Sequence, residues 1–191
     1  MKLQNNTDRV ILGIDPGTNI MGYGLIHVKG TQVRLIHMDI IILKKWPTHE
    51  MKLKSIFEQT SEVIEKYKPD EVALEAPFYG KNVQSMLKLG RAQGIAMAAA
   101  LHRNLPVFEY SPRKVKQSIT GKGTSSKEQV ATMLQRVLSI TAMPQKLDAT
   151  DALAVALCHY FQNRIGAGEE QKRYNGWKSF VSDNANKISG L

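Results

Sequence analysis

Four acidic side chains stand at positions where carboxylates could share metal ions. Asp15 and Glu75 are each the first polar residue after an apolar run, and a proline follows each of them within two residues. Asp148 and Asp151 are three residues apart at the start of a predicted helix, a spacing that places both on one helical face. If the two apolar runs form neighbouring strands, we expect the strand-end carboxylates to lie side by side.

A cluster of carboxylates is unfavourable by itself, because neighbouring negative charges resist ionising together. It becomes favourable around hard divalent cations such as Mg²⁺, which prefer oxygen ligands and keep several waters. Two such ions about 4 Å apart can hold a phosphodiester, one preparing the attacking water and the other stabilising the leaving oxygen. Singly, each acid could instead be a turn residue or a partner for a helix N-terminus. Their combination in one chain favours a metal site.

Positive charge is concentrated in one part of the 191-residue chain, whose formal net charge is +9. Between Lys81 and Lys127 there is one acidic residue, Glu109, and there are nine basic ones: Lys81, Lys88, Arg91, Arg103, Arg113, Lys114, Lys116, Lys122 and Lys127. Such a stretch suits a phosphate backbone, whose condensed counterions are released on contact. Simple solubility is the plainer interpretation. A basic surface around an acidic centre is what a metal-dependent nuclease requires.

Length and composition exclude several other classes. With 42% hydrophobic residues the chain can build a real core, and its length fits one domain with a short appendage. Cys158 is the only cysteine, which rules out an internal disulfide and a multi-cysteine zinc site and fits a reducing cytoplasm. The first residues are polar, and the most apolar segment, 94–101, is too short to span a bilayer. We therefore expect a cytoplasmic protein.

The elements that must position the acids follow from hydrophobic periodicity and turn residues. In chain order they are strands over 9–14, 20–28 and 31–43, a helix over 53–67, a strand over 71–74, a helix over 82–103, a strand over 107–110, and helices from Ser111, from Ser125 to Leu138 and from Leu147 to Asn163. Ser125 and Glu128 are expected to form the capping box of the penultimate helix. This order predicts an α/β layered domain with a mixed sheet, over 1–164, and a polar C-terminal tail, 165–191, expected to be disordered.

Five ordered motifs resemble the RuvC family of bacterial Holliday-junction resolvases, over roughly residues 9–163. The matching segments are Gly-Ile-Asp-Pro-Gly-Thr (13–18), Leu-Glu (74–75) with Phe78 and Lys-Asn (81–82), Ser85 to Gly94, Pro106 to Tyr110 with Val-Lys-Gln (115–117), and Asp-Ala-Thr-Asp-Ala-Leu-Ala (148–154). The resemblance implies a ribonuclease-H-like three-layer fold with a mixed five-stranded sheet flanked by helices. It also implies an endonuclease that resolves Holliday junctions by paired symmetric nicks in recombination and DNA repair.

The resemblance further implies which residues and partners carry the reaction. The metal ligands would be Asp15, Glu75, Asp148 and Asp151, holding two Mg²⁺ per active site, with Mn²⁺ as a substitute. Lys116 and Lys127 match basic positions near the scissile phosphate, where a lysine offsets transition-state charge. The protein would act as a homodimer on four-way junction DNA, together with the RuvA and RuvB branch-migration proteins.

The remaining expected DNA contacts have plainer alternatives, namely core packing for the aromatic residues and ordinary solvated surface for the polar ones. Phe78, beside Glu75, would wedge between bases at the junction centre, with Tyr79 next to it. Hydroxyls, amides and lysines commonly bind phosphates. The other expected contacts are Thr18, Asn19, Lys81, Asn82, Ser85, Arg113 and Lys122, beside the two lysines already assigned to the active site.

Gly90, Gly94 and Ala98 form a small-residue stripe on the long helix over 82–103. The stripe could pack on the sheet or meet its twin in a second copy. A junction with two-fold symmetry needs two cuts, which favours the isologous dimer. The five histidines show no ligand spacing.

Three other functions remain as alternatives. ATPases of the actin and sugar-kinase type share a strand followed by Asp-x-Gly-Thr, as in 15–18, but need a second such loop and a longer chain. A different ribonuclease-H-like nuclease would act on RNA–DNA hybrids. A non-catalytic junction-binding protein would bind the junction and form no product in Mg²⁺.

Overall fold

The structure, a computed structural model, describes residues 8–77, 82–141 and 147–168. Phe78, Tyr79 and Lys81 lie outside the described residues, as does most of the expected tail. The division into a domain over 1–164 and a disordered tail over 165–191 therefore stays a prediction.

A mixed five-stranded sheet forms the centre of the molecule, in the order β3-β2-β1-β4-β5. β1 pairs antiparallel with β2 and parallel with β4, β2 pairs antiparallel with β3, and β4 pairs parallel with β5. The elements are β1 (Arg9–Asp15), β2 (Ile20–Lys29), β3 (Gln32–Ile42), α1 (His49–Tyr67), β4 (Glu71–Glu75), α2 (Val83–His102), β5 (Val107–Tyr110), α3 (Pro112–Thr120), α4 (Lys127–Val137) and α5 (Asp148–Gly168). The predicted mixed sheet and three-layer architecture are confirmed.

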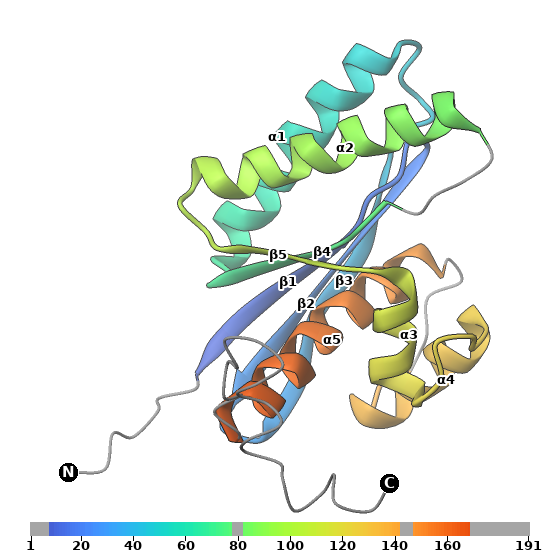
Figure 1. The fold of residues 1–191 in the computed structure, drawn as a ribbon. Coiled ribbons are helices and arrows are strands. Elements are labelled where there is room, and N and C mark those ends of the chain that lie inside the picture. Colours follow the sequence, from blue (N-terminus) through green and yellow to red (C-terminus); the bar gives the residue numbers. More distant parts are fainter. Residues whose placement is uncertain (1–7, 78–81, 142–146, 169–191) are drawn as a thin grey trace, which may run out of the picture.

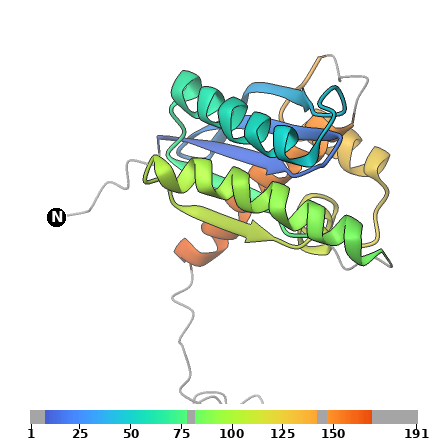
Figure 2. The same ribbon diagram turned by 90° about the horizontal axis from the view of Figure 1, so that it is seen from above.

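Helices cover both faces of this sheet (Figure 1). α1 and α2 lie side by side on one face, as the view from above shows (Figure 2), while α3, α4 and α5 lie on the other. β1 serves both layers, since Ile11 faces the core under α5 and Leu12 and Ile14 face the core under α1 and α2. All three are fully or almost fully buried, and each such side chain contributes roughly 1.5–3 kcal/mol.

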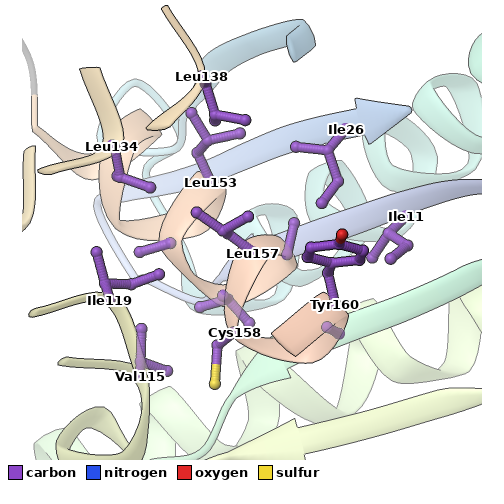
Figure 3. Close-up of a cluster of buried hydrophobic side chains, with 14 of the residues drawn as sticks. Ile11, Ile26, Val115, Ile119, Leu134, Leu138, Leu153, Leu157, Cys158 and Tyr160 are labelled. Carbon is purple, nitrogen blue, oxygen red and sulfur yellow. The ribbon is translucent and has the colours of Figure 1, made fainter. Parts of the chain in front are cut away.

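The core on the α5 side ties the later helices to the sheet (Figure 3). Leu153 and Leu157 of α5 are fully buried between Ile11 on β1 and the apolar faces of α3 and α4. Val115 of α3 and Leu134 of α4 belong to the same cluster, so α5 is the support on which both helices rest.

Glycines in β1 and β2 let α5 lie directly against the strands. A Cβ atom at Gly13 would stand 2.1 Å from the Ala152 carbonyl oxygen, and one at Gly22 would stand 2.0 Å from the carbonyl oxygen of Asp148. Real Cβ contacts are never this short, so any larger residue would push the helix away. Because Gly22 pairs with Asp15, this close packing brings the first turn of α5 to the end of β1.

Two boundaries differ from the sequence-based expectation. The capping box of α4 consists of Ser126 and Gln129, so the prediction of Ser125 and Glu128 is wrong by one residue. The hydroxyl of Ser125 instead forms a hydrogen bond with that of Thr120 at 2.8 Å and does not cap the helix. α5 continues to Gly168, beyond the expected end at Asn163. None of the described helices is long and apolar enough to span a membrane.

Candidate active site

Asp15 and Glu75 end two neighbouring parallel strands. Ile14 of β1 pairs with Leu74 of β4, so the two acids are the next residues along the same edge of the sheet. Four of the five strands, all except β2, run in the same direction. α1, α2 and α3 follow such strands and therefore all begin at this edge, where the positive ends of their dipoles favour negative charge.

A pocket of about 380 Å³ opens between the strand ends and α3, α4 and α5. Three of the four predicted carboxylates, those of Asp15, Glu75 and Asp151, line it together with Lys116 and Lys127. Asp148 does not line this pocket, although its charge acts on both Asp15 and Asp151. The fold thus gathers residues that are up to 136 positions apart in the sequence.

The carboxylates in the pocket resist ionisation. Burial, followed by the charge of Glu75, raises the pKa of Asp15 to about 8. Burial, followed by the charge of Asp151, raises the pKa of Glu75 to about 7. The pKa of Asp151 is also raised, chiefly by burial. The protein alone therefore offsets too little of the negative charge that these carboxylates carry when they ionise. A bound cation would offset it.

Two lysines supply positive charge to the same pocket. Lys127, the first residue of α4, forms an ion pair with Asp151. Burial opposes the charged form of Lys127, but this ion pair and the nearby acids raise its pKa overall. Lys116 on α3 lowers the pKa of both Glu75 and Asp151 by its charge. Both predicted lysines therefore face the acidic centre.

The donor set fits hard cations, because every candidate ligand is a carboxylate oxygen and the group carries excess negative charge. Within the described parts of the chain, no three acidic, histidine or cysteine side chains stand close enough together to coordinate one ion directly. The acids instead surround a pocket, an arrangement suited to Mg²⁺, which is commonly held by one or two carboxylates and retains waters.

Gln93 on α2 is a site residue that sequence reasoning missed. Its side chain is buried, and its amide nitrogen donates to the Glu109 carboxylate at 2.9 Å and to the backbone carbonyl of Glu75 at 3.4 Å. Together with Asp15 and Glu75 it lines a smaller recess beside the main pocket. A glutamine among the small residues of a helix gives no signal of such a role.

The expected DNA contacts fall into two groups. Thr18, Asn19 and Ser85 line a second pocket of about 330 Å³ between the β1–β2 loop, α1 and α2. Asn82 caps α2, its side-chain oxygen accepting the Ser85 N–H at 3.0 Å. Arg113 and Lys122 are exposed on α3 and in the loop after it. The fold thus brings three of these contacts into one pocket and leaves the other three outside it.

Strand order, helical layers and carboxylates at adjacent strand ends define a nuclease of the ribonuclease-H-like class. The family model described as crossover junction endodeoxyribonuclease RuvC matches residues 11–159. The chain belongs to the RuvC family. Its activity is therefore that of a crossover junction endodeoxyribonuclease, which cuts phosphodiesters at Holliday junctions.

Relatives match over nearly the whole chain. The crossover junction endodeoxyribonuclease RuvC of Cytophaga hutchinsonii is 58% identical, over 95% of this chain and 88% of its own length. The Bacteroides fragilis enzyme of the same description is 54% identical, over 97% of this chain and 99% of its own.

Solved structures give the same result for the fold. Thermus thermophilus RuvC in complex with a Holliday junction substrate superposes with a TM-score of 0.77 and 34% identity, over 83% of this chain and 96% of that one. The yeast mitochondrial resolvase Ydc2 shares the fold with a TM-score of 0.60 at 15% identity, over 84% of this chain and 83% of that one.

Proposed function

We propose that this chain resolves four-way DNA junctions with two Mg²⁺ ions held by Asp15, Glu75, Asp148 and Asp151, and that Mn²⁺ can substitute. The observation that carries the proposal is the convergence of Asp15, Glu75 and Asp151 on one pocket, with the pKa of each carboxyl raised. The ions would supply an activated water and a stabilised leaving oxygen. The chain's own part is to hold the scissile phosphate against this acidic centre.

We assign Lys116 and Lys127 to the scissile phosphate. Both side chains line the pocket, and positive charge there would stabilise the negative charge that develops as the phosphodiester is attacked. Lys127 pairs with Asp151 in the unbound protein. On DNA binding Lys127 would exchange that carboxylate for a phosphate oxygen, which would leave Asp151 available to hold a cation.

The rest of the DNA lies along the edge where α1, α2 and α3 begin. We assign backbone contacts to Thr18, Asn19, Lys81, Asn82, Ser85, Arg113 and Lys122. Phe78 and Tyr79 are three and four residues after Glu75, so an apolar wedge there would open the base stack beside the cut. Phe78, Tyr79 and Lys81 are assigned from the family resemblance alone, since they lie outside the described residues.

Homodimer formation through α2 is part of the same proposal. Val83, Leu87 and Leu101 are 65%, 52% and 56% exposed and share one face of α2 with the small-residue stripe. A Cβ added at Gly90 or Gly94 would meet nothing within 4 Å, so the stripe does not pack on the sheet. An exposed apolar face of this kind suits a second copy, which would place two active sites on one two-fold junction. The resemblance adds RuvA and RuvB as partners, and the single cysteine fits a cytoplasmic location.

Cleavage of three DNA substrates tests the proposal. In Mg²⁺, the purified protein is expected to nick a synthetic four-way junction on two opposing strands and to leave linear duplex and RNA–DNA hybrid intact. Cleavage of the hybrid with no junction product would contradict it and favour an RNA-processing nuclease. Junction binding without any product would favour a non-catalytic binder.

A further inference from the structure

The second pocket has the chemistry of a phosphate-binding site. Its wall includes Thr18 and Asn19 from the β1–β2 loop, Lys52 from α1, and Ser85 and Lys88 from α2. Among the described residues no carboxylate lines it, and polar surface predominates. A pocket of this composition would take an anion with several acceptor oxygens.

The positive charges of its two lysines are available to bind an anion. The ammonium group of Lys52 donates to the side-chain oxygen of Asn19 at 3.1 Å, a neutral partner. Within the described residues, neither Lys52 nor Lys88 forms an ion pair. Glu50 is the acid beside this pocket in sequence, but it does not line the pocket, and its carboxylate is engaged by Thr48 and by its own backbone N–H.

Two long helices add to the positive potential. α1 and α2 both begin at this pocket, and α2 has no acidic residue in its first turn to offset its dipole. His49 also lines the pocket, and its Nε2 is buried without a hydrogen-bond partner among the described residues. A ligand oxygen is the kind of acceptor that this nitrogen lacks.

The pocket lies close to the acidic centre. The loop that follows Asp15 supplies Thr18 to its wall, and three residues of chain span at most about 11 Å. α2 contributes Leu89 and Gln93 to the recess with Asp15 and Glu75, and Ser85 and Lys88, one turn earlier, to this pocket. A DNA strand advances about 3.4 Å per nucleotide along the duplex axis.

From this geometry we propose that the pocket binds one backbone phosphate of the cleaved strand, within three nucleotides of the scissile phosphate. Lys52, Lys88 and His49 are the groups that bind it. The inference rests on the proposed function, because it takes the acidic centre as the place of the cut. Binding there would fix the position of the DNA strand relative to the acidic centre. The hydrogen bond from Lys52 to Asn19 links the pocket to the loop that follows Asp15.

Lys88→Ala tests the site, because Lys88 is exposed and its replacement leaves the fold intact. Lys54→Ala is the matched control, since Lys54 is an exposed lysine on α1 outside the pocket. Junction affinity would be measured in chelator over a salt series. Loss of one phosphate contact should reduce the slope of log K against log salt by about 0.9, with Lys54→Ala like wild type. Equal slopes for all three proteins would overturn the proposal.

Neutral phosphates locate the contact. Junctions with a single methylphosphonate at the first, second or third phosphate on either side of the cut would be bound by wild type and by Lys88→Ala. At one of these positions, the neutral phosphate should weaken wild-type binding about threefold and weaken Lys88→Ala binding clearly less, because Lys88 is one of the groups that bind it. Additive losses at every position would overturn the assignment. The wild-type protein would cut the unmodified junction in either case, so failure of this inference is distinct from failure of the proposed function.

Discussion

At the scale of single residues, the carboxylates of the acidic centre lack enough nearby positive charge to balance them. Neighbouring strands hold Asp15 and Glu75 in a buried setting, and this burial raises the pKa of both carboxyls. Lys116 and Lys127 offset only part of this charge. The site therefore favours the binding of divalent ions, and these ions together with the lysines would offset the negative charge of a reacting phosphate.

The pH dependence of stability should report Asp15 directly. Its folded pKa of about 8 lies above its ordinary value of 3.8, so the unfolded chain ionises first as pH rises. Stability from this group is complete below pH 4 and is lost towards pH 8, and Glu75 acts in the same sense up to about pH 7. In chelator, the Tm of wild type should fall relative to Asp15→Asn across this range. Parallel curves for the two proteins would contradict the burial of Asp15.

Lys127→Ala should slow the chemical step more than it weakens binding. Loss of one positioned charge from the reaction site costs about 10²–10³ in rate, whereas junction affinity loses one contact among many. Single-turnover cleavage with saturating protein measures the step. Lys54→Ala, at an exposed lysine on α1 that lines neither pocket, is the control and should retain the wild-type rate. Equal rates for both variants would remove Lys127 from the active site.

At the scale of elements, the strand ends were predictable and the helix contacts were not. Apolar runs that stop at Asp15 and Glu75 identify two central strands, and parallel pairing of these strands brings the acids together. The glycines that admit α5 give a weaker signal, because Gly13 and Gly22 also suit a turn or an irregular strand. Only the fold shows that Gly22 lies against the backbone of Asp148.

Other parts of the site depend on contacts that the sequence does not encode locally. The Ser125 hydroxyl forms a hydrogen bond with Thr120, and the N-cap of α4 is Ser126 in place of the predicted Ser125. Lys52 and Lys88 are indistinguishable in sequence from ordinary surface lysines until α1 and α2 are placed side by side. The DNA contacts expected from 78–81 remain predictions.

Gly22→Ala tests whether α5 must lie against β2. The added methyl group would stand 2.0 Å from the Asp148 carbonyl oxygen, so the first turn of α5 must move. Cleavage should fall by at least tenfold even at temperatures where the protein is fully folded. Val28→Ala, on the same strand, is the control: it leaves a cavity that costs about 2 kcal/mol but keeps α5 in place. Loss of activity in both variants, in proportion to stability, would contradict a positional role for Gly22.

At the scale of the whole molecule, one edge of the sheet carries the groups that we assign to DNA binding and to catalysis. The helix N-termini, the lysines and the acidic centre all lie there, while the exposed apolar face of α2 points away from the sheet. This separation allows two copies to associate through α2 and still present both active sites to one junction.

Leu87→Asp should convert the proposed homodimer to a monomer. A buried unpaired carboxylate in each copy is costly, and the two-fold axis brings both into one interface. Sedimentation velocity measures the change, and coordinated nicking of both strands should be lost with it. Val137→Asp, at an exposed apolar position on α4, should remain a dimer. A Leu87→Asp dimer indistinguishable from wild type would place the interface elsewhere.

The metal dependence of nicking tests the central claim most directly. Wild type and Asp151→Asn would be incubated with a synthetic four-way junction at increasing Mg²⁺, with junction binding measured in parallel. We expect wild-type product only with Mg²⁺, and no product from Asp151→Asn despite retained binding. Cleavage by wild type in chelator, or by Asp151→Asn at the wild-type rate, would contradict a metal site built from these carboxylates.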